Sequence, residues 1–180
     1  MKDNNDLYSL KYPIGKYDYS REVSENDISQ WINDIEILPA KLRKIIQKLT
    51  DEKLNTPYRP GGWKVRQVVH HLCDSHLNGY VRFKLTITED KPTIKPYDEA
   101  KWAALQEYDQ LEVGDSLHFL ELLHKRWVIL LKSMKNTDFD RELNHPESGI
   151  LALKTYLGAY AWHGNHHLAH ITSLMERQGW

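Results

Sequence analysis

Hydrophobic residues recur along most of the chain at the three- and four-residue spacing of amphipathic helices. The pattern is clear over residues 27–49, and it returns over 64–89, 116–135 and 151–177. Because this spacing places apolar side chains on one face of a helix, we predict four long helices over these ranges. Pro39 lies inside the first of them and is expected to kink it.

Turn-forming residues separate these helices. Loops are expected over 56–63, 91–98 and 136–149, and a short helix over 99–108. Asp115 or Ser116 is expected to cap the third long helix, and Gly179 to end the fourth. Since no segment shows the period-two alternation of a strand, we predict an all-α protein with a four-helix bundle. The long connection over 90–115 is expected to act as a crossover or a lid.

The size and composition of the chain fit one globular domain. It has 180 residues, of which 41% are hydrophobic and 27% charged. We expect a polar N-terminal tail over 1–11 and a single domain over 12–180. The net charge of −1 argues against a nucleic-acid partner. No stretch is apolar enough for a membrane span or a signal peptide, so we predict a cytoplasmic protein without a membrane partner.

A single cysteine, Cys73, limits the chemistry that thiols can provide. It excludes an internal disulfide and a zinc site built from two cysteines and two histidines. We expect Cys73 to be a small buried residue. Histidine is the unusual residue type here, because the chain has 10 of them.

One group of histidines lies in WHGNHHLAHI, residues 162–171. Each residue turns a helix by about 100°. This rotation places His163 and His167 toward the apolar face and turns His166 and His170 toward solvent. An i, i+4 pair lies on one side of a helix, so His163 and His167 are positioned to bind one ion together.

A second group lies in HHLCDSH, residues 70–76. The helical pattern places His76 in the middle of the apolar face, His71 on a polar stripe beside it and His70 on the opposite side. Spacing alone leaves both His71 and His76 open as a third ligand. Asp74 is expected either to orient an imidazole or to be an ordinary surface acid, and the same helix carries Arg82 as a candidate pocket residue. His124 and Tyr160 are the other candidates for such a pocket.

Several long motifs resemble those of one known family. They are YPIGKY at 12–17, TPYRPGGWKVRQVVHHLCDSHLNGYVRFKLTITE at 56–89, KPYDEAKW at 95–102, HKRW at 124–127 and YAWHGNHHLAHIT at 160–172. With these motifs the chain resembles the YfiT group of the DinB superfamily, described as metal-dependent hydrolases. The resemblance implies a four-helix bundle, a cytoplasmic homodimer and one divalent ion per subunit, zinc or nickel. It also implies the ligands His71, His163 and His167, and so selects His71 over His76.

A three-histidine site leaves one position on the ion for water or substrate. We therefore predict a metal-dependent hydrolase acting on a small molecule, with no catalytic residue assigned, because His-Glu-x-x-His and Gly-x-Ser-x-Gly motifs are missing. The first alternative is transfer of a low-molecular-weight thiol, since parts of the superfamily are linked to bacillithiol. The second is a non-catalytic metal-binding stress protein, in which the ion would be closed off from any cavity. A di-iron site is disfavoured, because one of its two Glu-x-x-His pairs, Glu142 and His145, lies in a predicted loop.

Overall fold

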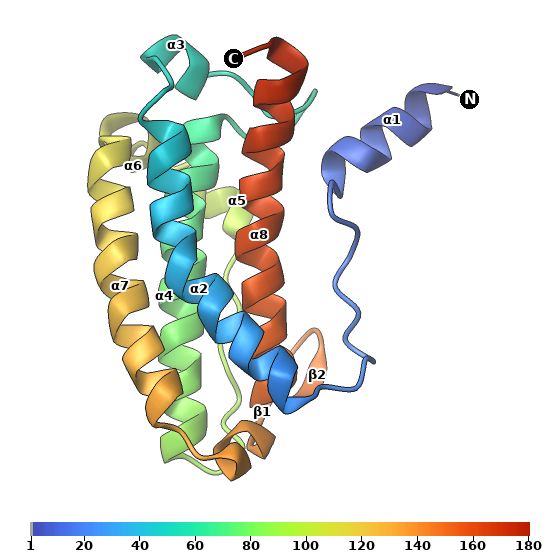
Figure 1. Cartoon of the computed structure of the whole chain (residues 1–180), viewed down its shortest axis with the longest axis vertical. Coiled ribbons are helices and arrows are strands. Elements are labelled where there is room, and N and C mark those ends of the chain that lie inside the picture. The colour runs from blue at the N-terminus through green and yellow to red at the C-terminus, as the bar shows by residue number, and fades with distance from the viewer. Residues whose placement is uncertain (1) are drawn as a thin grey trace.

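Four long helices form the body of the protein. The computed structural model describes the backbone of residues 2–180 and the side chains from Leu7 onward. The long helices are α2 (Glu25–Ile46), α4 (Val65–Thr88), α7 (Val113–Ser133) and α8 (Leu153–Gln178), and they lie side by side in Figure 1. The predicted all-α four-helix bundle is confirmed. None of the helices in the described residues combines the length and the apolar character that a membrane crossing needs.

The order of the helices around the bundle is set by a crossover. α2 packs against α7 and α8, and α4 packs against the same two helices. The colours of Figure 1 show α4 and α7 running in the same direction, so the chain must return the full length of the bundle between them. The connection after α4 makes this return, as predicted, and carries the short helices α5 (Glu99–Trp102) and α6 (Glu107–Gln110). These two helices replace the single helix expected over 99–108.

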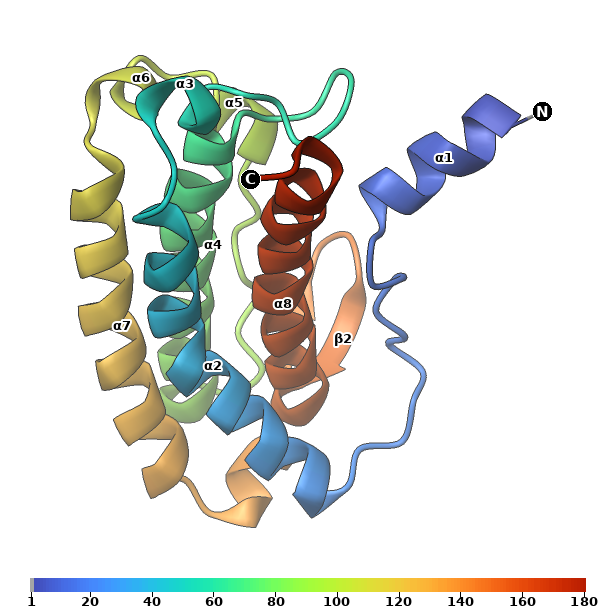
Figure 2. The same cartoon turned by 45° about the horizontal axis from the view of Figure 1, so that its top comes forward.

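A β-hairpin precedes α8, which corrects the expectation of a chain without strands. β1 (Glu142–His145) pairs antiparallel with β2 (Gly149–Ala152), and Leu143 lies opposite Leu151. The crossover packs alongside, because Asn144 exchanges backbone hydrogen bonds of 3.0 Å with Pro92 and Ile94. Figure 2 shows the hairpin beside α8. Strands this short carry too few residues for alternation to be visible in the sequence.

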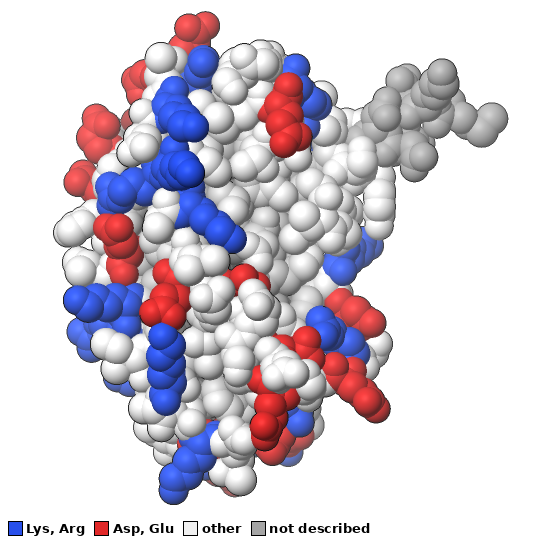
Figure 3. Space-filling view, viewed as in Figure 1, with Lys and Arg blue, Asp and Glu red and all other residues white. Residues whose placement is uncertain are grey.

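The remaining short elements are α1 (Lys2–Lys11), α3 (Asp51–Leu54) and the 3₁₀ helix η1 (Asn136–Asp140). α1 therefore falls within the segment expected to be a polar tail. Figure 3 shows basic and acidic side chains interspersed over the face that carries α2, α7 and α8, in keeping with the net charge of −1.

Local chemistry explains most helix ends. Ser24 and Asp27 form a reciprocal capping box at the start of α2, and Pro39 lies within that helix. Gly179 ends α8 with a φ of 66°, as predicted. α7 instead starts earlier than expected, at Val113, so neither Asp115 nor Ser116 caps it. Ser116 is buried, and its hydroxyl pairs with Nδ1 of His70 at 2.7 Å.

The core consists of two apolar clusters with a band of histidines between them. One cluster contains Leu42, Leu72 and Ile171, and the other contains Phe83 and Trp127. His76, His124 and His163 fall between the clusters on α4, α7 and α8 respectively. The polar groups of His76 and His124 must therefore find partners inside the bundle, because both rings are buried.

The segment that follows α1 runs along α8 in Figures 1 and 2. The Tyr17 hydroxyl donates a hydrogen bond of 3.0 Å to the backbone oxygen of Thr155. Gly158 makes this approach possible, because a Cβ atom there would overlap the Tyr17 hydroxyl and lie 2.7 Å from the Trp31 ring. A residue without a side chain is thus required where the segment and α2 meet α8.

We predict that Gly158→Ala lowers the free energy of unfolding by roughly 1–3 kcal/mol, the usual cost of overpacking a core. Gly114→Ala is the matched control, because a Cβ atom there would meet nothing within 4 Å. Its free energy of unfolding should stay the same or rise, since alanine favours the helix. Urea denaturation measures both variants. Equal stability of Gly158→Ala and the unmodified protein would contradict the close packing.

Candidate metal centre

The three histidines predicted as ligands come together in the middle of the bundle. His71 projects from α4, while His163 and His167 lie one turn apart on α8. One ring nitrogen from each lies within 4.8 Å of the others. The Nε2 atoms of His71 and His163 are 3.1 Å apart. His76, the other candidate, is fully buried behind His163 and does not join this group.

Close packing fixes these rings. Gly164 lies on α8 between the two histidines, and a Cβ atom there would collide with Leu38 of α2. The absence of a side chain at Gly164 therefore allows α2 to approach α8 closely at this level. Trp63 also packs against the three histidines. Its ring centroid lies 4.7 Å from that of His71 and 6.3 Å from that of His167. Trp63 comes from the loop over 56–63, which reaches across the end of the bundle.

Burial keeps all three imidazoles neutral. It lowers the pKa of His71 to about 3. Burial, reinforced by neighbouring histidines, also holds the pKa values of His163 and His167 well below their ordinary range. A neutral imidazole carries one N–H and one lone pair, and the lone pair is what binds a metal ion.

A chain of hydrogen bonds determines which nitrogen of His163 carries the proton. Nδ1 of His124 lies 2.6 Å from the backbone oxygen of Ile35, which can only accept. Nε2 of His124 therefore accepts from Nδ1 of His76, at 2.9 Å. Nε2 of His76 in turn accepts from Nδ1 of His163, at 3.3 Å. The lone pair of His163 is left on Nε2, the atom that faces His71.

A second chain does the same for His167. Nε2 of His170 donates to the backbone oxygen of Lys11 at 3.0 Å. Its Nδ1 then accepts from Nδ1 of His167, at 3.3 Å, which leaves the lone pair of His167 on Nε2. His71 differs, because its buried Nδ1 has no hydrogen-bond partner among the described residues.

The structure overturns the expectation that His166 and His170 face solvent. Only 6% of His166 and 3% of His170 is exposed. His170 stacks on Tyr58, with ring centroids 4.0 Å apart, and His166 stacks on Trp162 at 4.4 Å. The ring centroid of Tyr12 also lies 6.0 Å from that of His166. Trp162 lies one turn before His166 on α8, but Tyr12 and Tyr58 come from segments outside the bundle, and helical periodicity cannot reveal their cover.

Two cavities border the histidine group. The larger, here called the histidine cavity, has a volume of about 410 Å³ and is lined by His163, His167, His170, Tyr12, Arg59 and Trp63, among others. The second, here called the arginine cavity, has a volume of about 190 Å³ and is lined by His163, Arg82, Tyr97, Glu99, Glu147 and Tyr160, among others. Residues from the 56–63 loop line the histidine cavity, and residues from the crossover line the arginine cavity.

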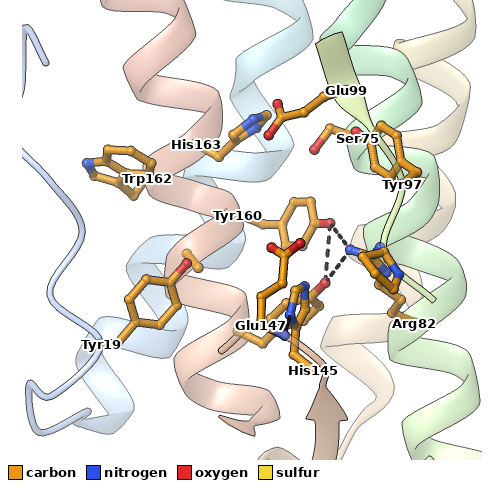
Figure 4. A pocket seen from close by; sticks show the side chains of 13 residues that line it. Tyr19, Ser75, Arg82, Tyr97, Glu99, His145, Glu147, Tyr160, Trp162 and His163 are labelled. Carbon is orange, nitrogen blue, oxygen red and sulfur yellow. Dashed lines mark hydrogen bonds between the residues drawn. The ribbon is translucent and has the colours of Figure 1, made fainter. Parts of the chain in front are cut away.

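Glu99 is a residue of the site that the sequence did not reveal. Its Oε2 atom lies 3.6 Å from Nε2 of His71, and its side chain borders both cavities. Figure 4 shows it directed toward His163. Burial, and next the charge of Glu147, raise the pKa of this carboxyl. Glu99 begins the short helix α5, so its position depends on the path of the crossover, for which the sequence contains no signal.

The other residues singled out from the sequence have mixed outcomes. Asp74 accepts a hydrogen bond from the Tyr108 hydroxyl, and no contact between it and an imidazole is found among the described residues. Cys73 is buried as expected, and burial raises the pKa of its thiol to about 12, so it is not a nucleophile. Arg82 and Tyr160 line the arginine cavity, whereas His124 lies behind His76.

The acids of the disfavoured di-iron site are occupied elsewhere. Glu121 forms an ion pair with Arg43 at 2.8 Å, and Glu142 forms one with Lys91 at 2.7 Å.

Several known proteins are similar to this chain over nearly its whole length. A Bacillus cereus protein named "Putative metal-dependent hydrolase" is 55% identical over 174 residues, covering 97% of this chain and 100% of its own. An Oceanobacillus iheyensis protein of the same description is 52% identical over 170 residues, covering 94% and 98%. The solved structure of YfiT from Bacillus subtilis, described as "a probable metal-dependent hydrolase with an unusual four-helix bundle topology", superposes with a TM-score of 0.92. It is 47% identical, covering 96% of this chain and 99% of its own. Residues 34–171 match the sequence profile of the DinB superfamily, and the chain therefore belongs to the DinB superfamily.

Proposed function

We propose that this protein is a metal-dependent hydrolase in which His71, His163 and His167 hold one divalent ion per subunit, zinc or nickel. The observation that carries the proposal is the convergence of three neutral imidazoles at the border of two cavities. Three nitrogen ligands suit zinc and nickel, and neither a carboxylate nor a thiolate takes a ligand position in the group. The names of the similar proteins support the same function.

The two cavities favour an enzyme over a closed metal-binding module. His163 lines both of them, so a position beside its Nε2 atom is within reach of a small molecule. When bound, a divalent ion in such a site supplies Lewis acidity, which lowers the pKa of water and polarises a carbonyl group. The residues of the chain must then hold the substrate and receive the proton that the attacking water loses.

Glu99 is positioned to receive that proton. Among the described residues it is the carboxylate that comes within 4 Å of a histidine of this group, with its Oε2 atom 3.6 Å from a proposed ligand nitrogen. Although 60% of its side chain is exposed, the partial loss of water around the carboxyl raises its pKa, and a raised pKa makes it a stronger base. We therefore propose that Oε2 of Glu99 accepts the proton from water and passes it to the leaving group.

The homodimer and the cytoplasmic location stay predictions that follow from the family resemblance. A surface that suits a second subunit is present on α7, where Phe119, Leu122 and Ile129 are exposed by 44%, 52% and 63%. Large apolar side chains gathered on one helix face are typical of subunit contacts.

We expect His71→Ala, His163→Ala and His167→Ala each to abolish stoichiometric metal binding, because two imidazoles hold an ion far less tightly than three. His166→Ala is the control, since this ring belongs to the same helix but not to the converging group. Elemental analysis of purified protein measures the metal, and circular dichroism checks the fold. Equal metal loss in all four variants would contradict the ligand assignment.

We expect His124→Phe to lower metal affinity by roughly 10–100-fold, the usual effect of removing a residue that orients a ligand. The change keeps a ring in place but removes the hydrogen bond that sets the tautomer of His76 and, through it, that of His163. His118→Phe is the matched control, because His118 lies on the same helix with its side chain 70% exposed. Competition with a chromophoric chelator measures affinity. Unchanged affinity in His124→Phe would disprove the role of the chain.

We expect Glu99→Gln to keep its metal and to lose hydrolytic activity by roughly 10²–10⁴-fold, because the amide cannot accept the proton. Glu107→Gln is the control on the same connection, since Glu107 lines neither cavity. Turnover of a panel of small esters and amides provides the measurement. Full activity in Glu99→Gln would exclude it as the base. Metal-dependent conjugation of an added thiol, without ester or amide cleavage, would instead support thiol transfer.

A further inference from the structure

Arg82 is a buried cation in a part of the site that the proposed reaction does not use. Its side chain projects from α4, and only 8% of the residue is exposed. The guanidinium donates to the Tyr156 hydroxyl at 2.9 Å, to the Tyr160 hydroxyl at 3.5 Å and to the backbone oxygen of Lys95 at 2.8 Å. In the part of the chain that the structure describes, no carboxylate pairs with it.

A buried charge without an opposite charge is costly, and such charges normally have a partner. The contacts of Arg82 are neutral oxygens, so its full positive charge remains available at the wall of the arginine cavity. The tyrosine hydroxyls accept from Arg82 and are hydrogen-bonded to each other at 3.4 Å, so one of the two protons remains for donation to a ligand. Figure 4 shows Arg82 and Tyr160 together at one end of this cavity. The group thus presents a positive charge and several hydrogen-bond donors, which is the chemistry that binds an anion.

This anion-binding group lies close to the proposed metal ligands. The ring of Tyr160 is 6.1 Å from the ring of His163, between centroids. Because His163 and Arg82 line the same cavity, one small molecule can contact both. If Arg82 binds the charged group of a substrate, a bond a few atoms along the substrate from that group would lie beside His163.

Two acidic side chains line the same cavity and narrow the choice of ligand. Glu147, in the hairpin turn, borders the cavity with Tyr160 and Arg82 (Figure 4), and no lysine or arginine pairs with it among the described residues. Glu99 also lines the cavity, and the charge of Glu147 contributes to raising its pKa. With two carboxylates and one guanidinium, the cavity disfavours a multiply charged anion such as phosphate. A molecule that carries one carboxylate and one protonated amine would complement charges of both signs.

We infer that Arg82 anchors the carboxylate of a small zwitterionic substrate of the amino-acid or dipeptide class, whose amine faces Glu147. This inference rests on the proposed function for the position of the bond that is cleaved, but the binding site itself does not require a metal ion. The two can therefore be tested separately.

The first experiment measures binding of glycylglycine and of its C-terminal amide to unmodified, metal-free protein by calorimetry or ligand-observed NMR. We expect the free carboxylate to bind roughly tenfold or more tightly, as is typical for a hydrogen-bonded charge. Equal binding of the two ligands would overturn the inference without any variant being made. Binding without hydrolysis in the metal-loaded protein would instead count against the proposed function alone.

The second experiment assigns this preference to residues. In Arg82→Gln the preference for the free carboxylate should disappear. Arg141→Gln is the matched control, because Arg141 also donates to backbone oxygens, those of Thr86 and Glu89, but lines neither cavity next to the histidines. If the preference persists in Arg82→Gln, the inference is wrong.

A third variant avoids the core altogether. Glu147→Gln changes an exposed residue of the hairpin turn, so the fold should be unaffected. We expect it to weaken the binding of glycylglycine severalfold but to leave the binding of the N-acetylated dipeptide unchanged, because that ligand carries no ammonium group. Equal effects on both ligands, or none on either, would contradict the assigned orientation.

Discussion

A buried imidazole must find an acceptor for its N–H and a use for its lone pair, and this constraint organises the centre of the protein. Histidines from three helices occupy the band between two apolar clusters, and His76 and His124 are buried there without access to water. Each of the two hydrogen-bond chains ends on a backbone oxygen, that of Ile35 or that of Lys11, which can only accept. Because a neutral ring has one proton, the direction set at that oxygen passes along the chain to His163 and His167. Through a chain of two or three histidines, the backbone oxygen thus determines which ring nitrogen of His163 and of His167 carries the lone pair at the common centre.

The same constraint explains why segments outside the bundle matter. One of the fixed oxygens belongs to Lys11, at the end of α1, so the chain before the bundle completes the environment of His167 through His170. The loop over 56–63 contributes Tyr58, which stacks on His170, and Trp63, which packs against His71. The bundle holds the three converging histidines and Arg82 on long helices, whereas the crossover and the hairpin supply Glu99 and Glu147 to the arginine cavity. Helices thus fix the geometry of the three histidines, whereas the residues that loops supply to the cavity wall can vary without changing that geometry.

The sequence predicts whatever depends on one helix face and fails where separate segments meet. Periodicity identified the four long helices, the inward direction of His163 and His167, and the burial of His76. Periodicity could not decide whether His71 or His76 is the third ligand, because that depends on how α4 is rotated against α8. The family resemblance selected His71. The prediction that His166 and His170 face solvent was wrong, since Tyr12 and Tyr58 cover them from segments that no helical pattern encodes. Glu99 was missed for a similar reason, because a crossover brings it 3.6 Å from His71 across the bundle.

The charges around the centre differ between the histidines and the wall of the arginine cavity. The histidines themselves are neutral, so they add no charge that would oppose a cation between them. The arginine cavity is lined by Glu99 and Glu147, which are exposed, and by Arg82, which is buried. Water screens a buried charge less than an exposed one, so Arg82 acts more strongly on a ligand group of opposite charge than either glutamate does. A polar molecule entering the cavity would therefore be oriented by these side chains before it reached the histidines, and its orientation would decide which of its bonds lies beside them.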